Sequence, residues 1–255
     1  MNKLLSAAAV AVTLALVAGP SIADELVREN RSVDAKVTKV RLDGIVDLVV
    51  RQGNTPALVV SGDHRYVQRI TTSQRGDTLE IGTESFNTRN GDMHEKLRAE
   101  LTVPNLAEFS SHGVGATTVT GFTGNSIQVA LDGAGSVTMN GAYRNIDARL
   151  GGVGGLALHG VRAERVDLNL RGAGRISVSG ESKLLRAKLA GVGNLEAQDL
   201  RAESVDLDLS GLGGATVHAT RAADVDLSGM GSATVYGKPA SRNVNASGMG
   251  KVAWK

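Results

Sequence analysis

Residues 166–178 read VDLNLRGAGRISV, and two patterns that decide the fold meet in this stretch. Before the glycine doublet, Val166, Leu168 and Leu170 alternate with polar residues, and the alternation resumes at Ile176 after it. A period of two predicts strands with one buried face and excludes a helix of this length. The stretch therefore predicts two strands that meet at a Gly-X-Gly corner.

The doublet recurs eight times at intervals of 18 to 20 residues. Its first glycines are Gly113, Gly133, Gly152, Gly172, Gly191, Gly211, Gly229 and Gly248. A fixed period of this size is typical of stacked repeats, in which each unit needs its neighbours to bury its apolar side. The sequence therefore predicts an all-β fold, a parallel β-solenoid (β-helix) of two sheets with about eight regular coils.

The residue between the two glycines is Val, Ala, Leu or Met in every copy. We expect this residue to point into the core, with its glycines adopting backbone angles that a Cβ would penalise. The position two residues before the doublet, occupied by Leu in six consecutive coils, is expected to form a second inward ladder. Each coil is then a strand, a Gly-X-Gly corner, a second strand and a short return loop.

The chain opens with Lys3, an apolar run and a small-residue site before Asp24, which predicts a secretory signal peptide over residues 1–23. Export to the periplasm, the cell surface or the medium follows. Residues 24–255 are predicted to form a single domain, with irregular coils over 24–112 and regular ones over 113–255. No later stretch is apolar enough to span a membrane.

Composition excludes several functional classes. The chain has no cysteine, so a disulfide, a thiolate metal site and a cysteine nucleophile are excluded. Removal of Lys3 with the signal peptide leaves 27 basic against 26 acidic residues, and the chain has no basic run. Nucleic acid is therefore not an expected partner. No phosphate-binding or nucleophile motif is present, so no cofactor and no catalytic residue are predicted.

The region before the first doublet is predicted to be β-rich. Strands are expected over 33–37, 45–51, 58–61, 78–81 and 97–103, with a short helical turn over 67–71 and a polar loop over 86–96. Arg75-Gly76-Asp77 matches an integrin-binding tripeptide. A β-turn between two strands explains this tripeptide better, because Gly-Asp is ordinary turn chemistry.

Several motifs in this order resemble one protein family. They are LDGIVDL at 42–48, GDTLEI at 76–81, LTVPNL at 101–106 and the Gly-X-Gly series. Together they resemble the putative autotransporter adhesin, head GIN domain family. The resemblance implies a right-handed superhelix of two sheets with tight turns at the glycines. It also implies a fold similar to that of pectin lyases, but without their catalytic residues, and a role in adhesion. A C-terminal translocator is not expected, because Trp254-Lys255 closes the last coil.

Outward positions before the corner carry charge in several neighbouring coils. Arg186 is expected to pair with Asp167, and Lys188 with Asp208. Four like charges come next in the stack, at Asp206, Asp208, Asp224 and Asp226. Such a group is unfavourable unless it is solvated, neutralised or bridged by a cation. A solvated face is the favoured interpretation, and weak Ca²⁺ binding is the alternative.

Outward positions after the corner are small and almost uncharged, which predicts a flat neutral face. The candidate binding residues on it are Thr138, His159, Ser177, Ser179, Thr216, His218, Thr234 and Tyr236. Ordinary solvated sheet is the alternative. The chain is thus interpreted as a non-catalytic binding, adhesion or structural module of the cell envelope, with a second copy or a surface polysaccharide as partner. A pectin-lyase-like enzyme or polysaccharide-binding protein is the competing interpretation, and short, even loops without walls for a cleft count against the enzyme.

Overall fold

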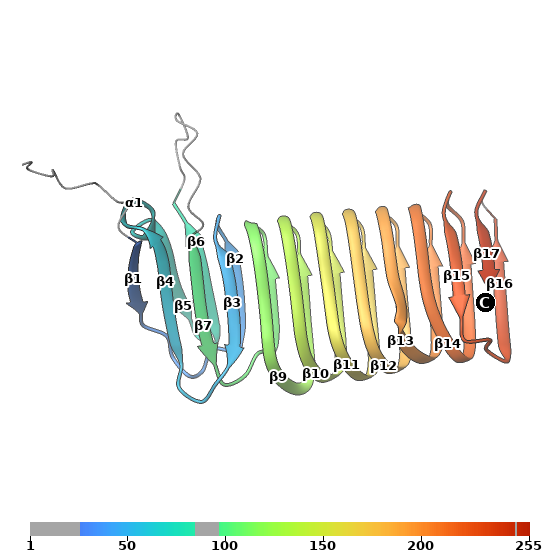
Figure 1. The fold of residues 1–255 in the computed structure, drawn as a ribbon, viewed down its shortest axis with the longest axis horizontal. Helices are drawn as coiled ribbons and strands as arrows, with labels where there is room; N and C mark the ends of the chain where they lie inside the picture. Colours follow the sequence, from blue (N-terminus) through green and yellow to red (C-terminus); the bar gives the residue numbers. More distant parts are fainter. Residues whose placement is uncertain (1–25, 85–96, 248) are drawn as a thin grey trace, which may run out of the picture.

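The computed structural model describes residues 26–84, 97–247 and 249–255. The predicted signal peptide, the whole of the predicted loop over 86–96 and the first glycine of the last doublet lie outside these ranges. The described chain is a rod of stacked coils (Figure 1). The only helix within it, α1 (His64–Val67), has four residues, so no helix in the described ranges is long and apolar enough to cross a membrane.

Six long strands form the regular part of the rod. They are β9 (Val114–Leu131), β10 (Ala134–Leu150), β11 (Val153–Leu170), β12 (Ala173–Leu189), β13 (Val192–Leu209) and β14 (Leu212–Leu227). Neighbours pair in parallel, doublet over doublet, as in Gly135↔Gly154 and Gly154↔Gly174. The next coil is divided into β15 (Ser232–Tyr236) and β16 (Ser241–Ala246), and β17 (Lys251–Trp254) follows. The predicted parallel β-solenoid is confirmed.

Each long strand covers both sheets, because it passes through a second corner without a break. The pairing register shifts there, for example between Leu158 and Val161 on β11 and between Ser177 and Gly180 on β12. A register shift lets a strand bend without losing its ladder over the rest of its length. The expected return loop is therefore a bend within the strand.

The ladder two residues before the doublet is buried, as predicted. Its six leucines are at most 4% exposed: Leu131, Leu150, Leu170, Leu189, Leu209 and Leu227. Each buried leucine contributes about 1.5–3 kcal/mol relative to an exposed one. Their column continues the core of the rod from one coil to the next.

The prediction that the residue between the two glycines points inward is wrong. Val153 is 62% exposed and Val192 is 56% exposed. The period of two runs unbroken through the corner, so the two glycines occupy the inward positions and the residue between them faces out. A Cβ on Gly154 would overlap the carbonyl oxygen of Gly135 in the coil before. Only glycine leaves room for the backbones of successive coils to approach this closely.

The N-terminal strands stack in an order that differs from the order of the chain. One coil consists of β2 (Lys39–Asp43) and β3 (Asp47–Gln52). On one side it pairs with the coil of β6 (Thr78–Thr83) and β7 (Arg98–Val103). On the other side it pairs with the coil of β8 (Glu108–Ser111) and β9. Ile45 bridges to Val114. The turn at Gly44 is therefore a further corner in the same column as the glycine doublets.

Antiparallel strands cover the N-terminal end of the rod. β4 (Ala57–Asp63) pairs with β7 and with β1 (Leu26–Arg31), and β5 (Ile70–Arg75) forms a hairpin with β6. The strands predicted around 45–51, 58–61, 78–81 and 97–103 are confirmed within a few residues. The helical turn predicted over 67–71 is misplaced, because α1 spans His64–Val67 and residues 70–71 belong to β5. The strand predicted over 33–37 is a turn. Polar turn chemistry at Asp34, which accepts a bond from Lys36 N, overrides the short alternation.

Candidate functional site

The candidate binding residues lie on one sheet of the rod. This neutral face is built from the first half of each long strand and from β15. The register places Thr138, Ala157, Ser177, Glu196, Thr216 and Thr234 directly above one another. In the second column, His159 lies beside Ser179 and His218 lies beside Tyr236, but the pairing register shifts between these two groups. The structure therefore places the candidate residues on one sheet, the first column as one ladder and the second as two separate pairs.

Hydrogen bonds between coils connect the side chains of the neutral face. His159 Nδ1 lies 3.3 Å from Ser179 Oγ, and Thr216 Oγ1 donates to Gln198 Oε1 at 2.6 Å. Asn194 Oδ1 accepts from the backbone N–H of Gly214 at 2.9 Å. Side chains that are already bonded to a neighbour lose little further freedom when a partner covers them.

The neutral face is not completely uncharged. Near its corner edge, Arg175 Nε lies 3.2 Å from Glu196 Oε1 in the next coil. Both groups are exposed, so the pair contributes little to stability. It does cancel the net charge in the middle of the face. Sequence reasoning placed Glu196 here but missed Arg175, which occupies the outward column closest to the doublet.

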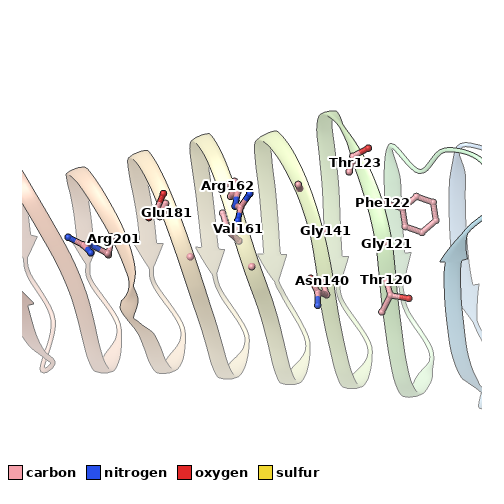
Figure 2. A pocket seen from close by; sticks show the side chains of 13 residues that line it. Thr120, Gly121, Phe122, Thr123, Asn140, Gly141, Val161, Arg162, Glu181 and Arg201 are labelled. Carbon is pink, nitrogen blue, oxygen red and sulfur yellow. The ribbon is translucent and has the colours of Figure 1, made fainter.

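A shallow groove runs along the second corner beside the neutral face. Its volume is about 670 Å³, and it crosses several successive coils (Figure 2). It passes over glycines in one column of four coils: Gly121, Gly141, Gly160 and Gly180. Thr120 and Asn140 of the neutral face form one side, and Arg162, Glu181 and Arg201 line the other. The groove was not predicted, although a glycine eight residues after the first glycine of the doublet repeats in the first four coils.

The other sheet is a charged face with ion pairs within and between its coils. Arg165 Nε lies 2.6 Å from Asp167 Oδ2 within one strand. Arg186 pairs with Asp206 at 3.6 Å, and Lys188 pairs with Asp208 at 3.6 Å. The predicted partner of Lys188 is confirmed. The predicted pair of Arg186 with Asp167 is wrong, because Arg165 on the same strand reaches Asp167 first.

The four aspartates of the acidic group lie in adjacent strands, with Asp206 beside Asp224 and Asp208 beside Asp226. Arg186, Lys188 and Asn243 supply partners, and Asn243 Nδ2 donates to Asp224 Oδ1 at 3.1 Å. Among the described residues, no three His, Asp or Glu side chains gather closely enough to hold a metal ion. The calcium hypothesis gains no support from this geometry, which instead fits a solvated face neutralised by its neighbours.

Three groups with shifted pKa values are scattered over the described part of the chain. A hydrogen bond from the Arg65 side chain lowers the pKa of Asp63 at the start of α1. A hydrogen bond from Lys39 lowers the pKa of Asp77. Burial raises the pKa of the Tyr143 phenol, which donates to the Leu106 carbonyl oxygen. Each shift has a structural cause, and the three groups form no common site.

Arg75-Gly76-Asp77 lies where β5 meets β6 in a tight hairpin. Gly76 has φ of 62°, a conformation that a Cβ would strain. Asp77 accepts from Lys39 Nζ, which lies 3.2 Å away in the neighbouring coil. The turn interpretation of this tripeptide is confirmed.

Known structures share this architecture. A putative adhesin from Parabacteroides distasonis has a TM-score of 0.80 and 19% sequence identity, and the match covers 91% of this chain and 98% of that chain. A putative lipid binding protein from the same organism has a TM-score of 0.76 and 19% identity, and the match covers 90% of this chain and 97% of that chain. A putative adhesin from Bacteroides fragilis has a TM-score of 0.69 and 22% identity, covering 92% and 99%. At these identities the likeness shows the fold alone.

No curated protein matches the chain in sequence. The profile of one family, described as "Putative auto-transporter adhesin, head GIN domain", matches residues 36–239, from just before β2 to the loop between β15 and β16. The matched part contains seven of the eight doublets and both faces. The chain therefore belongs to the putative auto-transporter adhesin, head GIN domain family.

Proposed function

We propose that this protein is a non-catalytic binding module of the cell envelope whose neutral face holds a flat partner, with surface polysaccharide as the first candidate. One observation carries the proposal: a column of mostly small, half-buried side chains from Thr138 to Thr234 continues in register over six successive coils. Such a surface loses little water and little rotamer freedom on contact, so a large area can be covered at low cost.

The charged face is a poorer candidate for adhesion. A partner there would have to displace water from Asp206, Asp208, Arg186 and Lys188, and the cost of removing charges from water often exceeds what new pairs return. The groove extends the neutral face by adding bare backbone at its glycine column and two cations at its far side. An extended polymer could therefore lie along the face and fill the groove.

The competing interpretation, a polysaccharide-cleaving enzyme, gains no support from the groove. Hydrolysis of a glycosidic bond ordinarily uses two carboxyl groups on opposite sides of the scissile bond. Among the residues that line the groove, Glu181 is the single carboxylate, and its lateral neighbours in the adjacent coils are Arg162 and Arg201. Family names that describe adhesins agree with the non-catalytic proposal.

The export predicted from residues 1–23 places such a module outside the cytoplasm. We further propose that residues 24–255 act as one unit there, since the N-terminal strands pair with β9 and share its core. A rod with one flat face can present that face to a neighbouring surface along its whole length.

The test uses beads coated with the secreted chain and two probes, purified capsular polysaccharide and intact bacterial cells. Thr138→Lys with Ser177→Lys places two long cations on β10 and β12, two coils apart, and should abolish binding of both probes while the circular dichroism spectrum is unchanged. Asp167→Lys with Arg186→Glu reverses two charges on the charged face without changing its net charge and should leave binding intact. Loss of binding only in the second variant would refute the choice of face.

A further inference from the structure

The corner edge of the rod carries a row of exposed apolar side chains, here called the corner ridge. Its members are Ile45, Val114, Ala134, Val153, Ala173, Val192, Leu212, Met230 and Met249. The larger ones are 40–81% exposed. Soluble proteins rarely expose apolar side chains contiguously, and such patches mark contact sites. The proposed adhesive face lies on a different side of the rod and does not account for this ridge.

The ridge is continuous and held rigidly. Register pairs place Ile45 beside Val114, Val114 beside Ala134, and each later member beside the next as far as Leu212. The flanking glycines cannot be replaced without overlap with the neighbouring coil, so the outward direction of each side chain is fixed by the backbone. Eight steps of about 4.8 Å make the ridge about 38 Å long.

The width of the ridge decides what kind of partner fits it. A strip about 38 Å long and about 10 Å wide, the separation of two packed sheets, offers about 400 Å². A stable protein interface needs about 800 Å² from each partner, so the ridge is too narrow to hold a second copy firmly by itself. A bilayer surface conforms to a narrow convex edge and can take up each side chain separately.

The residues on either side of the ridge fit a lipid surface over most of its length. They are the residue before each doublet and the residue after it, and they are mainly Gly, Ala, Ser and Asn. From Gly151 to Lys251 these two columns contain Arg171, Arg175 and Lys251 and no carboxylate. Asp208 and Asp226 lie further away, on the charged face, and Glu196, which pairs with Arg175, lies further away on the neutral face. Cations beside an apolar row favour anionic headgroups.

We propose that the corner ridge inserts into the interfacial region of an anionic lipid bilayer and lays the rod along the membrane. Val153, Val192, Leu212 and Met230 enter the boundary between headgroups and acyl chains, while both sheets stay in water. This arrangement leaves the neutral face free at the side of the rod. The protein then makes two separate contacts, one with lipid and one, which rests on the proposed function, with the adhesive partner.

The absence of cysteine allows a direct test. Val192→Cys places a single thiol on the ridge, and Ser177→Cys places one on the neutral face. Each is labelled with a polarity-sensitive dye and mixed with vesicles of phosphatidylglycerol and phosphatidylethanolamine. The dye at position 192 should brighten, shift to the blue and be quenched by brominated acyl chains, whereas the dye at 177 should respond to neither.

Flotation with the same vesicles measures the contribution of the ridge without a dye. Val192→Asn with Leu212→Asn should weaken vesicle binding about tenfold or more, since two apolar contacts are lost. Thr138→Lys with Ser177→Lys should still float while losing adhesion, so failure of this proposal and failure of the proposed function are distinguishable. If the dye at position 192 does not respond to vesicles, the lipid proposal is wrong. It is also wrong if the dye shifts to the blue without lipid and the protein sediments as a dimer.

Discussion

Two columns of the solenoid are apolar throughout the regular coils between Leu131 and Leu227, yet they lie on opposite sides of the backbone. The column two residues before the doublet is buried, as at Leu170, which is 1% exposed. The column between the glycines is exposed, as at Val192 and Met230. Apolar character alone therefore does not identify the core in a repeat with tight corners. The position of a residue within the alternation does identify the core, because the glycines occupy the inward positions at the corner.

The largest expected effect is on the buried column. Leu170→Asp places a carboxylate among leucines about 4.8 Å away in both directions and should prevent folding, because no partner can compensate the buried charge. Leu170→Ala should lower the free energy of unfolding by about 2–5 kcal/mol. Urea unfolding followed by circular dichroism measures both. Asn169→Asp, which faces out, is the control and should be nearly neutral; equal damage at 169 and 170 would contradict the assignment.

An intermediate effect is expected at the glycines that separate the two columns. Gly154→Ala adds a Cβ that overlaps the Gly135 carbonyl oxygen, at a φ of 146° that disfavours any side chain. We expect a loss of about 3 kcal/mol or more in the free energy of unfolding. Gly155→Ala is a matched control one residue away, because its Cβ would meet nothing within 4 Å. A loss at Gly155 as large as that at Gly154 would contradict the argument that the close approach of the two backbones limits this site.

The smallest expected effect on stability is at the exposed column. Val192→Asn with Leu212→Asn should change the free energy of unfolding by no more than about 0.5 kcal/mol for each residue, since neither side chain packs in the core. Thermal melts of this double variant and of Leu170→Ala, measured under the same conditions, give the comparison of stability. Strong destabilisation by the exposed pair would mean that the ridge supports the fold, and its effect on vesicle binding could then not be attributed to lipid contact.

Much of the regular part could be predicted from the sequence. The period at Gly172 and its equivalents predicts coil length and stacking, because identical short units can bury their apolar side only against one another. The neutral face could also be predicted, since Thr138 and Ser177 share a column once the period is known. The groove could have been found in the same way from Gly121, Gly141, Gly160 and Gly180.

The N-terminal end could not be predicted in the same detail. Its strands lack a repeat, and the coil of β2 and β3 inserts between β6–β7 and β8–β9, contacts that the chain order does not reveal. The antiparallel pair of β1 with β4 likewise depends on long-range contacts. Local alternation identified most of these strands but carried no information about their neighbours.

By itself the sequence determined the class of fold, the length of each coil, the buried leucine column and the sheet on which each polar residue lies. These follow from periodicities, which act locally along the chain. Only the tertiary structure decided which way the residue between the glycines points, which acid Arg186 reaches and in what order the first coils stack. Those outcomes depend on how closely the backbones of two coils approach each other, and that distance exists only after the coils have packed.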